Sequence, residues 1–339
     1  MKDMNKTKAQ LLKELEALRK QNAALEKKTG QGPTVPGHYK KEFILSAIDA
    51  MTDTFFVFEP EKKKALLWNK AFREISGYTD EEIAAMKVPD EWFSIQDLKW
   101  ADAAMALSFE EGQSTVDMSL ITKNGTLQPF EYISSMMRDE QGKPKYLVAI
   151  GRDISEHRLV EEYLEWQLKV TLSLTHLFRP LLAPDSSIED IAYAVLREAQ
   201  SLTGSEHGMV SAIDPETGES VGHTWTKMEN KEYTVTNERQ RVVFPRGEDG
   251  SYPGLWGYAL NTRQPFYTNL ATKHPAAQDV PEGHSRIKRF LAIPVVKGEE
   301  VLGQVALANS PQDYSERELE AVQRVSEFYG LAIERFRGG

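Results

Sequence analysis

The chain has 339 residues, a formal net charge of −10 and no cysteine. This length favours two domains, and a hydrophobic content of 40% is enough for two cores. The acidic balance argues against nucleic acid and anionic membrane surfaces as partners, and the lack of cysteine excludes disulfides, thiolate metal sites, thioether-linked bilins and cysteinyl-flavin photochemistry. The polar N-terminus and the short apolar runs predict no signal peptide and no membrane span, so we expect a cytoplasmic protein.

Residues 1–29 are predicted to form a helix that pairs with a second copy of the chain. No glycine or proline interrupts residues 4–28, and leucine recurs there every seven residues. One asparagine at heptad position a, with leucine at d, favours a parallel two-stranded coiled coil, because the amides pair across the seam only in register. The alternative is a solvated helix without a partner. We therefore predict a homodimer with a seam formed by Leu11, Leu15, Leu18, Asn22 and Leu25.

A glycine- and proline-rich linker at 30–40 leads into a first domain, which is predicted at 41–155. Thr79 and Glu82 have the spacing of a helix-capping box, and Asn124-Gly125 is expected to make a tight hairpin turn with positive φ angles. Two short strands, several helices and a three-strand meander follow one another, with the clearest segments at 54–59, 65–68, 95–111, 114–122, 127–137 and 144–151. This mixture is typical of the α+β fold class.

Several motifs of this domain resemble those of a PAS sensor domain. They are Trp68-Asn69, Gly77-Tyr78-Thr79 and the closing run Gly151-Arg152-Asp153-Ile154-Ser155, in which serine replaces the usual threonine. The resemblance covers about 41–158 and implies a five-stranded antiparallel sheet with helices on one face. It also implies that Asp153 and Ile154 couple the core to the next helix. The alternative role for Asp153 is that of a simple helix cap.

The first domain is not expected to hold haem or photoactive flavin. Haem-binding PAS domains present a histidine from their long helix, and the segment 95–111 contains none. The flavin photosensors of this fold need a cysteine, which the chain lacks. A small metabolite and no ligand at all are the alternatives that the sequence leaves open.

A connecting helix is predicted at 156–182, with apolar residues at coiled-coil spacing. Two interpretations fit this spacing equally: a signalling linker between domains, or a helix that packs against a neighbouring domain. His176 begins a run similar to the phosphoacceptor box of histidine kinases, but Leu177 stands where that box has an acid. The chain also has no glycine-rich ATP lid, so we assign His176 no catalytic role.

A second domain is predicted at 183–339, with a helix from Ser187, a long polar stretch at 228–253 and a short helix near 254–260. Two apolar segments before the last helix, Phe290-Leu291-Ala292-Ile293-Pro294 and 301–309, resemble the central strands of a GAF domain. The resemblance spans roughly 170–337. It implies a six-stranded antiparallel sheet with helices behind it and a ligand pocket in front, under the long loops.

Four residues are candidates for ligand contact in this second domain: His284, Trp256, Tyr258 and Asn269. Aromatic side chains with a few polar groups suit a small ligand, and a histidine could meet an anion. For His284 the alternative is a solvated loop residue, and for the two aromatic residues it is a place in the core. No metal site and no bilin attachment are expected.

Together these features predict a cytoplasmic signal-transduction sensor that binds a small ligand and acts through dimeric helices on a kinase, cyclase or response partner. The domain pair resembles the input region of bacterial and archaeal sensor histidine kinases. One alternative is therefore the input half of a longer kinase or nucleotide cyclase. A second alternative is a dimerisation scaffold without a ligand, and no enzymatic activity is expected.

Overall fold

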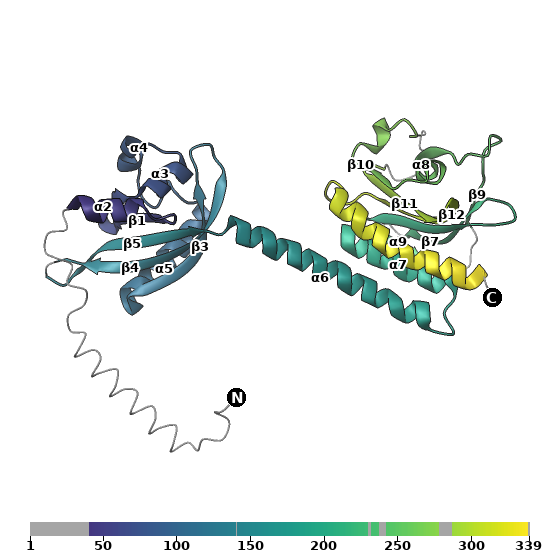
Figure 1. Ribbon diagram of the computed structural model, residues 1–339, viewed down its shortest axis with the longest axis horizontal. Coiled ribbons are helices and arrows are strands. Elements are labelled where there is room, and N and C mark those ends of the chain that lie inside the picture. Colours follow the sequence, from purple (N-terminus) through teal and green to yellow (C-terminus); the bar gives the residue numbers. More distant parts are fainter. Residues whose placement is uncertain (1–40, 140, 230–231, 237–241, 278–286, 338–339) are drawn as a thin grey trace, which may run out of the picture. The chain divides into compact units, whose positions relative to one another are not determined.

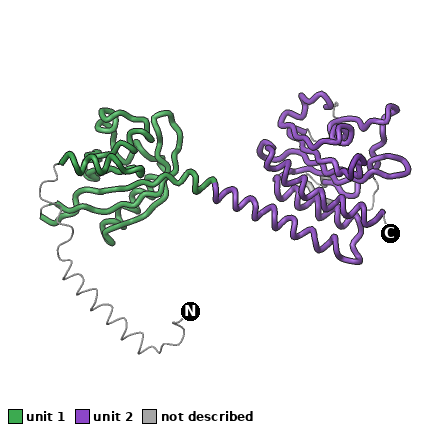
Figure 2. The backbone as a smooth tube through the Cα atoms, viewed as in Figure 1, with its two compact units in different colours: residues 1–159 green, residues 160–339 purple. Residues whose placement is uncertain are grey.

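The computed structural model describes residues 41–337 apart from 140, 230–231, 237–241 and 278–286. The predicted coiled coil with its seam, the predicted linker and His284 lie outside the described residues. The chain divides into two compact units, residues 1–159 and 160–339 (Figure 2), and each is described by itself. In the part of the chain that the structure describes, no helix is long and apolar enough to cross a membrane.

The first unit is built on a five-stranded antiparallel sheet in the order β2-β1-β5-β4-β3 (Figure 1). Helices α3, α4 and α5 pack against one face of this sheet and share a single core with it. This confirms the predicted α+β arrangement. The elements are α2 (Lys41–Asp49), β1 (Thr54–Glu59), β2 (Lys64–Trp68), α3 (Lys70–Ser76), α4 (Asp80–Ala85), α5 (Ile95–Glu111), β3 (Gln113–Ile121), β4 (Leu127–Arg138) and β5 (Pro144–Asp153).

Asn69 ties three elements of the first unit together and is fully buried. Its side-chain oxygen accepts hydrogen bonds from the backbone N–H groups of Phe55 and Phe72, both at 3.0 Å, and so joins β1 to the first turn of α3. Its amide nitrogen donates to the carbonyl groups of Ile48 and Asp53. The Trp68-Asn69 motif therefore forms the corner at which α2, β1 and α3 meet.

Two local predictions for this unit have different outcomes. The capping box is present, because the side chains of Thr79 and Glu82 each accept the backbone N–H of the other residue. The hairpin turn at Asn124-Gly125 is present, because the Gly125 N–H donates to the Thr122 carbonyl at 2.8 Å, but of these two residues only Gly125 has a positive φ, of 85°. Asn124 contributes through its side chain, which accepts the N–H of Thr126.

Helix α6 (Ser155–Leu182) begins after the last strand of the first unit, and its later part packs inside the second unit. Val170 and Leu177 are buried in the core that α6 shares with α7 (Ile188–Thr203) and α9 (Glu316–Arg337). The guanidinium of Arg317 lies 4.0 Å from the ring centre of Trp166. Of the two interpretations of this helix, the later part of α6 therefore fits the second, a helix that packs against a neighbouring domain.

The second unit is built on a seven-stranded sheet, in which β10-β11-β12-β6-β7-β8 form one path and β9 also pairs with β7. The expectation of six strands is wrong, and both β8 and β9 form within 228–253. Short peripheral strands need no long apolar run, so composition gave no signal there. The elements after α7 are β6 (His207–Ile213), β7 (Ser220–Glu229), β8 (Glu232–Thr236), β9 (Val242–Phe244), α8 (Gly254–Thr262), β10 (Phe266–Thr268), β11 (Phe290–Lys297), β12 (Glu300–Ala308) and α9.

The sheet of the second unit carries a different layer on each face (Figure 1). Along β12, Val305 and Leu307 belong to the large core under α6, α7 and α9, whereas Ala306 and Ala308 belong to a smaller cluster under α8. This alternation follows from the pleat, which turns successive side chains to opposite faces. Helices α7 and α9 and the later part of α6 therefore lie behind the sheet, and α8 lies in front of it.

Candidate ligand site of the first unit

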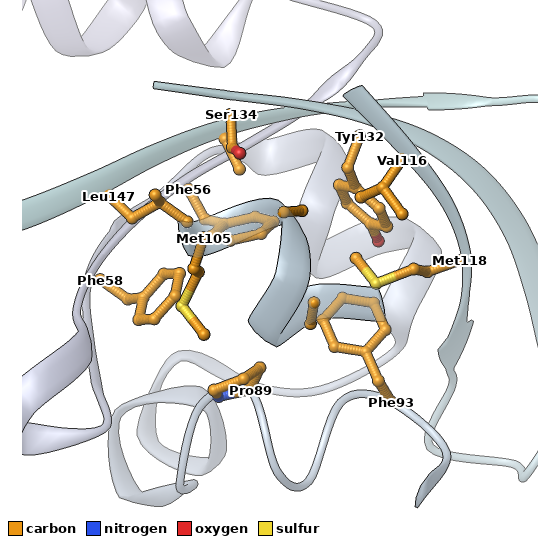
Figure 3. Close-up of a pocket in the computed structure, with 13 residues that line it drawn as sticks. Phe56, Phe58, Pro89, Phe93, Met105, Val116, Met118, Tyr132, Ser134 and Leu147 are labelled. Carbon is orange, nitrogen blue, oxygen red and sulfur yellow. The ribbon is translucent and has the colours of Figure 1, made fainter. Parts of the chain in front are cut away.

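A cavity of about 30 Å³ lies inside the core of the first unit (Figure 3). Strand β1 contributes Phe56 and Phe58, helix α5 contributes Met105, and β3 contributes Met118. A space of this size takes only one or two water molecules. Methionine side chains are flexible, so a shift of Met105 and Met118 would enlarge the space without moving the backbone.

The hydroxyl of Tyr132 is the polar group at this cavity that lacks a partner. The side chain is 1% exposed, and its oxygen has no hydrogen-bond partner among the residues described. The ring is held edge-on by Phe93 and Phe56, with ring centres 5.4 and 5.9 Å away, and Figure 3 shows the hydroxyl on the side where Met118 and Phe93 lie. Burial raises the pKa of Tyr132 far above its ordinary value, so the hydroxyl stays neutral and can donate a hydrogen bond.

A second polar group at the cavity, Ser134, is fully partnered. The hydroxyl oxygens of Ser108, Ser114 and Ser134 lie 2.8 to 3.0 Å from one another, and all three side chains are buried. These serines come from α5, β3 and β4, so their hydroxyl groups satisfy one another and join three elements at the cavity wall. Ser134 therefore needs no ligand to be satisfied, in contrast to Tyr132.

Trp92 adds a second unpartnered donor to the same core. It is fully buried, and its indole N–H has no acceptor within the described parts of the chain. The Trp92 ring centre lies 4.5 Å from that of Phe72 and 5.0 Å from that of Phe56. Trp92 does not line the cavity, so Tyr132 is the donor that a ligand in the cavity would meet.

The ring of Tyr132 lies directly on the backbone of β5, opposite Gly151. A Cβ atom at Gly151 would be 2.5 Å from Tyr132 Cε1 and 2.5 Å from Thr54 Oγ1, so the site has no room for a side chain. Thr54 Oγ1 also donates to the Gly151 carbonyl at 2.9 Å. The cavity wall therefore touches β5 two residues before Asp153.

Asp153 and Ile154 bind the start of α6 to the start of β4. One carboxylate oxygen of Asp153 accepts the N–H of Ser155 at 2.8 Å, and the other accepts from Gln128 Nε2 at 2.9 Å. The N–H of Ile154 donates to the Pro129 carbonyl at 3.1 Å. Burial alone raises the pKa of Asp153, but the hydrogen bonds from Ser155 and Gln128 outweigh it and hold that pKa below its ordinary value. Asp153 thus caps α6 and also links it to the sheet.

Tyr132 is not among the residues predicted to meet a ligand. A signal was present, because Tyr132 lies two residues after Phe130 on the same strand and so shares its inward face. Whether that hydroxyl finds a partner depends on β1, β3 and α5, which are distant in the chain. No local pattern could therefore identify it as the unpartnered group.

Of the predicted ligand residues of the second unit that the structure describes, Trp256 and Tyr258 lie on α8 and Asn269 lies after β10. Trp256 packs against the small apolar clusters under α8, and the ring of Tyr258 lies 4.7 Å from Phe266 and 4.8 Å from His274. Asn269 uses both ends of its amide on the backbone of Tyr314, donating to its carbonyl and accepting its N–H. Trp256 and Tyr258 therefore lie on one helix, while Asn269 fixes a loop.

Two candidate chemistries, metal binding and phosphoryl transfer, are not supported by the arrangement of the described residues. Over the described ranges, no three His, Cys, Asp or Glu residues are grouped so as to hold a metal ion. His176 is exposed, and its Nδ1 lies 3.0 Å from a carboxylate oxygen of Glu198. This neighbour comes from α7 and not from the residue that follows the histidine.

Two models of known domain families match the chain. One is described as a PAS domain and matches residues 52–156, and the other is described as a GAF domain and matches residues 185–334. Over 296 residues the chain is 26% identical to the methyl sulfide methyltransferase-associated sensor of Methanosarcina acetivorans. That match covers 85% of this chain and 28% of the relative, so the chain spans little more than a quarter of the relative's length.

Solved structures of both kinds of domain are similar to parts of the chain. A PAS domain from Colwellia psychrerythraea is 19% identical, with 34% of this chain and 97% of that chain covered and a TM-score of 0.32. The GAF domain of a phosphoenolpyruvate-protein phosphotransferase from Coxiella burnetii is 20% identical, with 50% and 97% covered and a TM-score of 0.40. By the family matches, residues 52–156 are a PAS domain and residues 185–334 a GAF domain, so the chain carries two sensor domains of signal-transduction proteins in series.

Proposed function

We propose that the PAS domain binds a compact, uncharged and mainly apolar ligand that accepts a hydrogen bond from Tyr132. The observation that carries this proposal is the neutral, fully buried Tyr132 hydroxyl, which has no partner among the described residues. A buried hydroxyl without a hydrogen bond is unfavourable, and a ligand acceptor would remove that penalty. We assign the chain a binding role rather than a catalytic one.

The lining of the cavity limits the ligand's chemistry. No charged side chain lines it, so a ligand charge would be buried without a counterion. Haem and flavin do not fit about 30 Å³ without displacement of the core, and no histidine lines the space. A molecule of a few heavy atoms fits best, with Met105 and Met118 adjusting around it.

We further propose that ligand occupancy is transmitted from Tyr132 to α6. The contact of the Tyr132 ring with the β5 backbone at Gly151 lies next to the bonds that Asp153 and Ile154 make at the start of α6. A shift of the ring would move β5 and alter those bonds. Because α6 packs into the GAF domain, the shift would reach the second domain along one helix.

The wider setting of the sensor is also a proposal. We propose a cytoplasmic homodimer that pairs through the coiled coil predicted at 1–29 and acts on a kinase, cyclase or response partner. This mechanism is the same whether the chain is a separate regulatory protein or the input half of a longer sensor kinase or cyclase. The ligand-free scaffold is the rival hypothesis, and it expects no small molecule in the cavity.

The test uses the full chain labelled with ¹³C-methyl methionine and titrated with tetrahydrofuran, cyclopentane and dimethyl sulfide. Tetrahydrofuran and cyclopentane have the same size, and only the first accepts a hydrogen bond. Dimethyl sulfide is included because it is compact and uncharged, and because the relative from Methanosarcina acetivorans is named as associated with a methyl sulfide methyltransferase.

We expect the methyl resonances of Met105 and Met118 to shift, and tetrahydrofuran to bind more tightly than cyclopentane. In Tyr132→Phe the preference for tetrahydrofuran should fall by about five- to tenfold, the value of one hydrogen bond near 1 kcal/mol. The proposal fails if no probe moves these two resonances, or if Tyr132→Phe changes both affinities equally.

A further inference from the structure

The wall of the cavity in the PAS domain carries two thioether sulfur atoms, those of Met105 and Met118. The chain has ten methionines and no cysteine, so thioethers are the sulfur groups that an oxidant can meet in it. A peroxide converts methionine to its sulfoxide, which adds one oxygen atom to the side chain. The space of about 30 Å³ beside these sulfur atoms has room for such an oxygen.

Met118 and Tyr132 are neighbours on one face of the sheet. Strands β3 and β4 pair Met118 with Phe130 and Val116 with Tyr132, so Met118 and Tyr132 are diagonal neighbours. The Cα atoms of such a pair are roughly 7–8 Å apart, a distance that long side chains bridge. Both residues line the cavity, and Figure 3 shows the Tyr132 hydroxyl on the side where Met118 lies. The hydroxyl without a partner among the described residues is therefore beside the Met118 side chain.

Met105 lines the same cavity, but it comes from helix α5 and not from the sheet. In Figure 3 its side chain lies near Phe58, away from the Tyr132 hydroxyl. Met105 and Met118 therefore share one cavity and differ in their distance from its hydrogen-bond donor. Met137, near the end of β4, lies outside the cavity lining and is 47% exposed, so it shows how an accessible thioether of the same domain reacts.

We propose that Met118 is an oxidation site, at which hydrogen peroxide transfers one oxygen atom to the thioether sulfur. A lone pair of the sulfur attacks one peroxide oxygen, the O–O bond breaks, and the other oxygen leaves as hydroxide. The hydroxide then removes the proton from the oxygen that is now on sulfur, so the products are the sulfoxide and water. The sulfur is oxidised by two electrons, and the peroxide is reduced by the same two.

The Tyr132 hydroxyl serves both the reaction and its product. Negative charge develops on the departing oxygen, and a hydrogen bond from Tyr132, which keeps its proton, stabilises that charge in the dry cavity. The sulfoxide oxygen is then buried among apolar side chains, where a polar group without a hydrogen bond is unfavourable. The same hydroxyl donates to that oxygen and removes the penalty. A buried thioether without such a donor should react more slowly than an exposed one.

This inference rests on the cavity and the donor of the proposed function, but it needs no bound ligand. A sulfoxide that is hydrogen-bonded to Tyr132 would draw on the ring that lies against Gly151, and so on β5. Sulfoxide reductases return methionine sulfoxide to methionine, so the change is reversible. The PAS domain would thus record exposure to a peroxide as a covalent change next to the strand that leads into α6.

The test exposes the full chain to hydrogen peroxide or to tert-butyl hydroperoxide and follows each methionine by peptide mass spectrometry. Only hydrogen peroxide is small enough for the cavity. We expect it to oxidise Met118, which is 6% exposed, at least as fast as Met137, and about fivefold or more faster than Met105. tert-Butyl hydroperoxide should oxidise Met137 and spare Met118.

Tyr132→Phe isolates the role of the hydroxyl. We expect oxidation of Met118 to slow by about five- to tenfold, the factor of one hydrogen bond, while the rate at Met137 stays the same. Met118→Leu conserves the volume and should remove the mass gain from that peptide, which confirms the assignment. An unchanged Met118 rate in Tyr132→Phe would overturn the inference. Equal oxidation of Met118 by the two peroxides, which indicates opening of the domain, would overturn it as well.

Two experimental patterns separate the oxidation site from the proposed ligand. If tetrahydrofuran shifts the Met105 and Met118 resonances but hydrogen peroxide does not oxidise Met118, the oxidation site alone is rejected. If Met118 is oxidised with the expected dependence on Tyr132 and none of the three ligand probes moves these resonances, the ligand alone is rejected and the oxidation site stands.

Discussion

The PAS and GAF domains both pack helices on an antiparallel sheet, but they differ in where their buried polar groups without hydrogen-bond partners lie. In the PAS domain the sheet and helices α3, α4 and α5 share one core, and the cavity and Tyr132 lie within it. In the GAF domain the large core lies behind the sheet, whereas the buried amide of Gln304, which has no partner among the described residues, lies in front of it on the face that α8 covers. Core packing and the surroundings of the unpartnered polar group should therefore be inseparable in the first domain and separable in the second.

The sharpest test of inseparability is Phe56→Ala. Phe56 is 3% exposed, lines the cavity, and has its ring centre 5.0 to 5.9 Å from those of Trp92, Phe72 and Tyr132. We expect the PAS domain to lose about 3–5 kcal/mol of unfolding free energy, and tetrahydrofuran to lose its site. Urea denaturation of the full chain measures the loss, and hydrogen exchange assigns it to the domain.

Phe109→Ala is the matched control, since Phe109 is on α5 and 46% exposed. It should change stability by less than about 1 kcal/mol and leave binding intact. Equal losses in the two variants would contradict the single-core description.

The next largest effect is expected for Leu291→Ala in the GAF domain. Leu291 is fully buried in the large core behind the sheet, so its truncation should cost about 2–4 kcal/mol. The ¹⁹F resonance of a 5-fluorotryptophan at Trp256 should stay unchanged below the unfolding transition, because Trp256 packs on the other face of the sheet. Calorimetry gives the stability, and ¹⁹F NMR follows the Trp256 resonance.

Leu331→Ala, at a residue 53% exposed on α9, is the control for that substitution. If Leu291→Ala shifted the Trp256 resonance while the domain stayed folded, the two faces would not be separable, and the comparison would break.

A smaller effect is expected at the junction between the PAS domain and α6. Asp153→Ala should cost about 1 kcal/mol, the usual worth of a helix cap, and should speed hydrogen exchange in the first turn of α6. The folded-state pKa of Asp153 lies below the ordinary 3.8, so its stabilisation is full above that value and is lost as the pH falls through the lowered pKa.

Amide exchange of Ser155 and Glu156 measured between pH 3 and 6, after correction for intrinsic rates, checks this dependence. Asp102, an exposed aspartate within α5, gives the control substitution Asp102→Ala. Protection of α6 that did not fall in Asp153→Ala would leave Asp153 without its coupling role.

The smallest effect on stability is expected for Tyr132→Phe. Removal of a buried hydroxyl without a partner should leave the Tm unchanged or slightly higher, while it weakens ligands that accept a hydrogen bond. Tyr146→Phe, at another tyrosine of the same sheet, is the control. A clear drop in Tm for Tyr132→Phe would reveal a structural partner for the hydroxyl.

The elements of both domains were largely predictable because their signals are local. The capping box at Thr79–Glu82, the helix from Ser187 and the apolar strand at 290–296 each depend on residues within one or two turns or on simple alternation. Strands β8 and β9 escaped prediction, since peripheral strands carry a weak apolar pattern. The turn at Asn124-Gly125 formed, but a positive φ occurs at Gly125 and not at Asn124, because the turn type also depends on how β3 and β4 pair.

Sequence alone determined the order of the elements, the two sensor domains and the absence of cysteine chemistry, because these follow from composition and short-range pattern. Only the tertiary structure decided that Val170 and Leu177 are buried in the GAF core, since the same spacing suits a coiled coil and a packed helix. It also decided that Tyr132, Trp92 and Gln304 are among the buried polar groups of the described residues that have no hydrogen-bond partner. Whether a buried donor or acceptor finds a partner depends on strands and helices far away in the chain, and no local pattern contains that information.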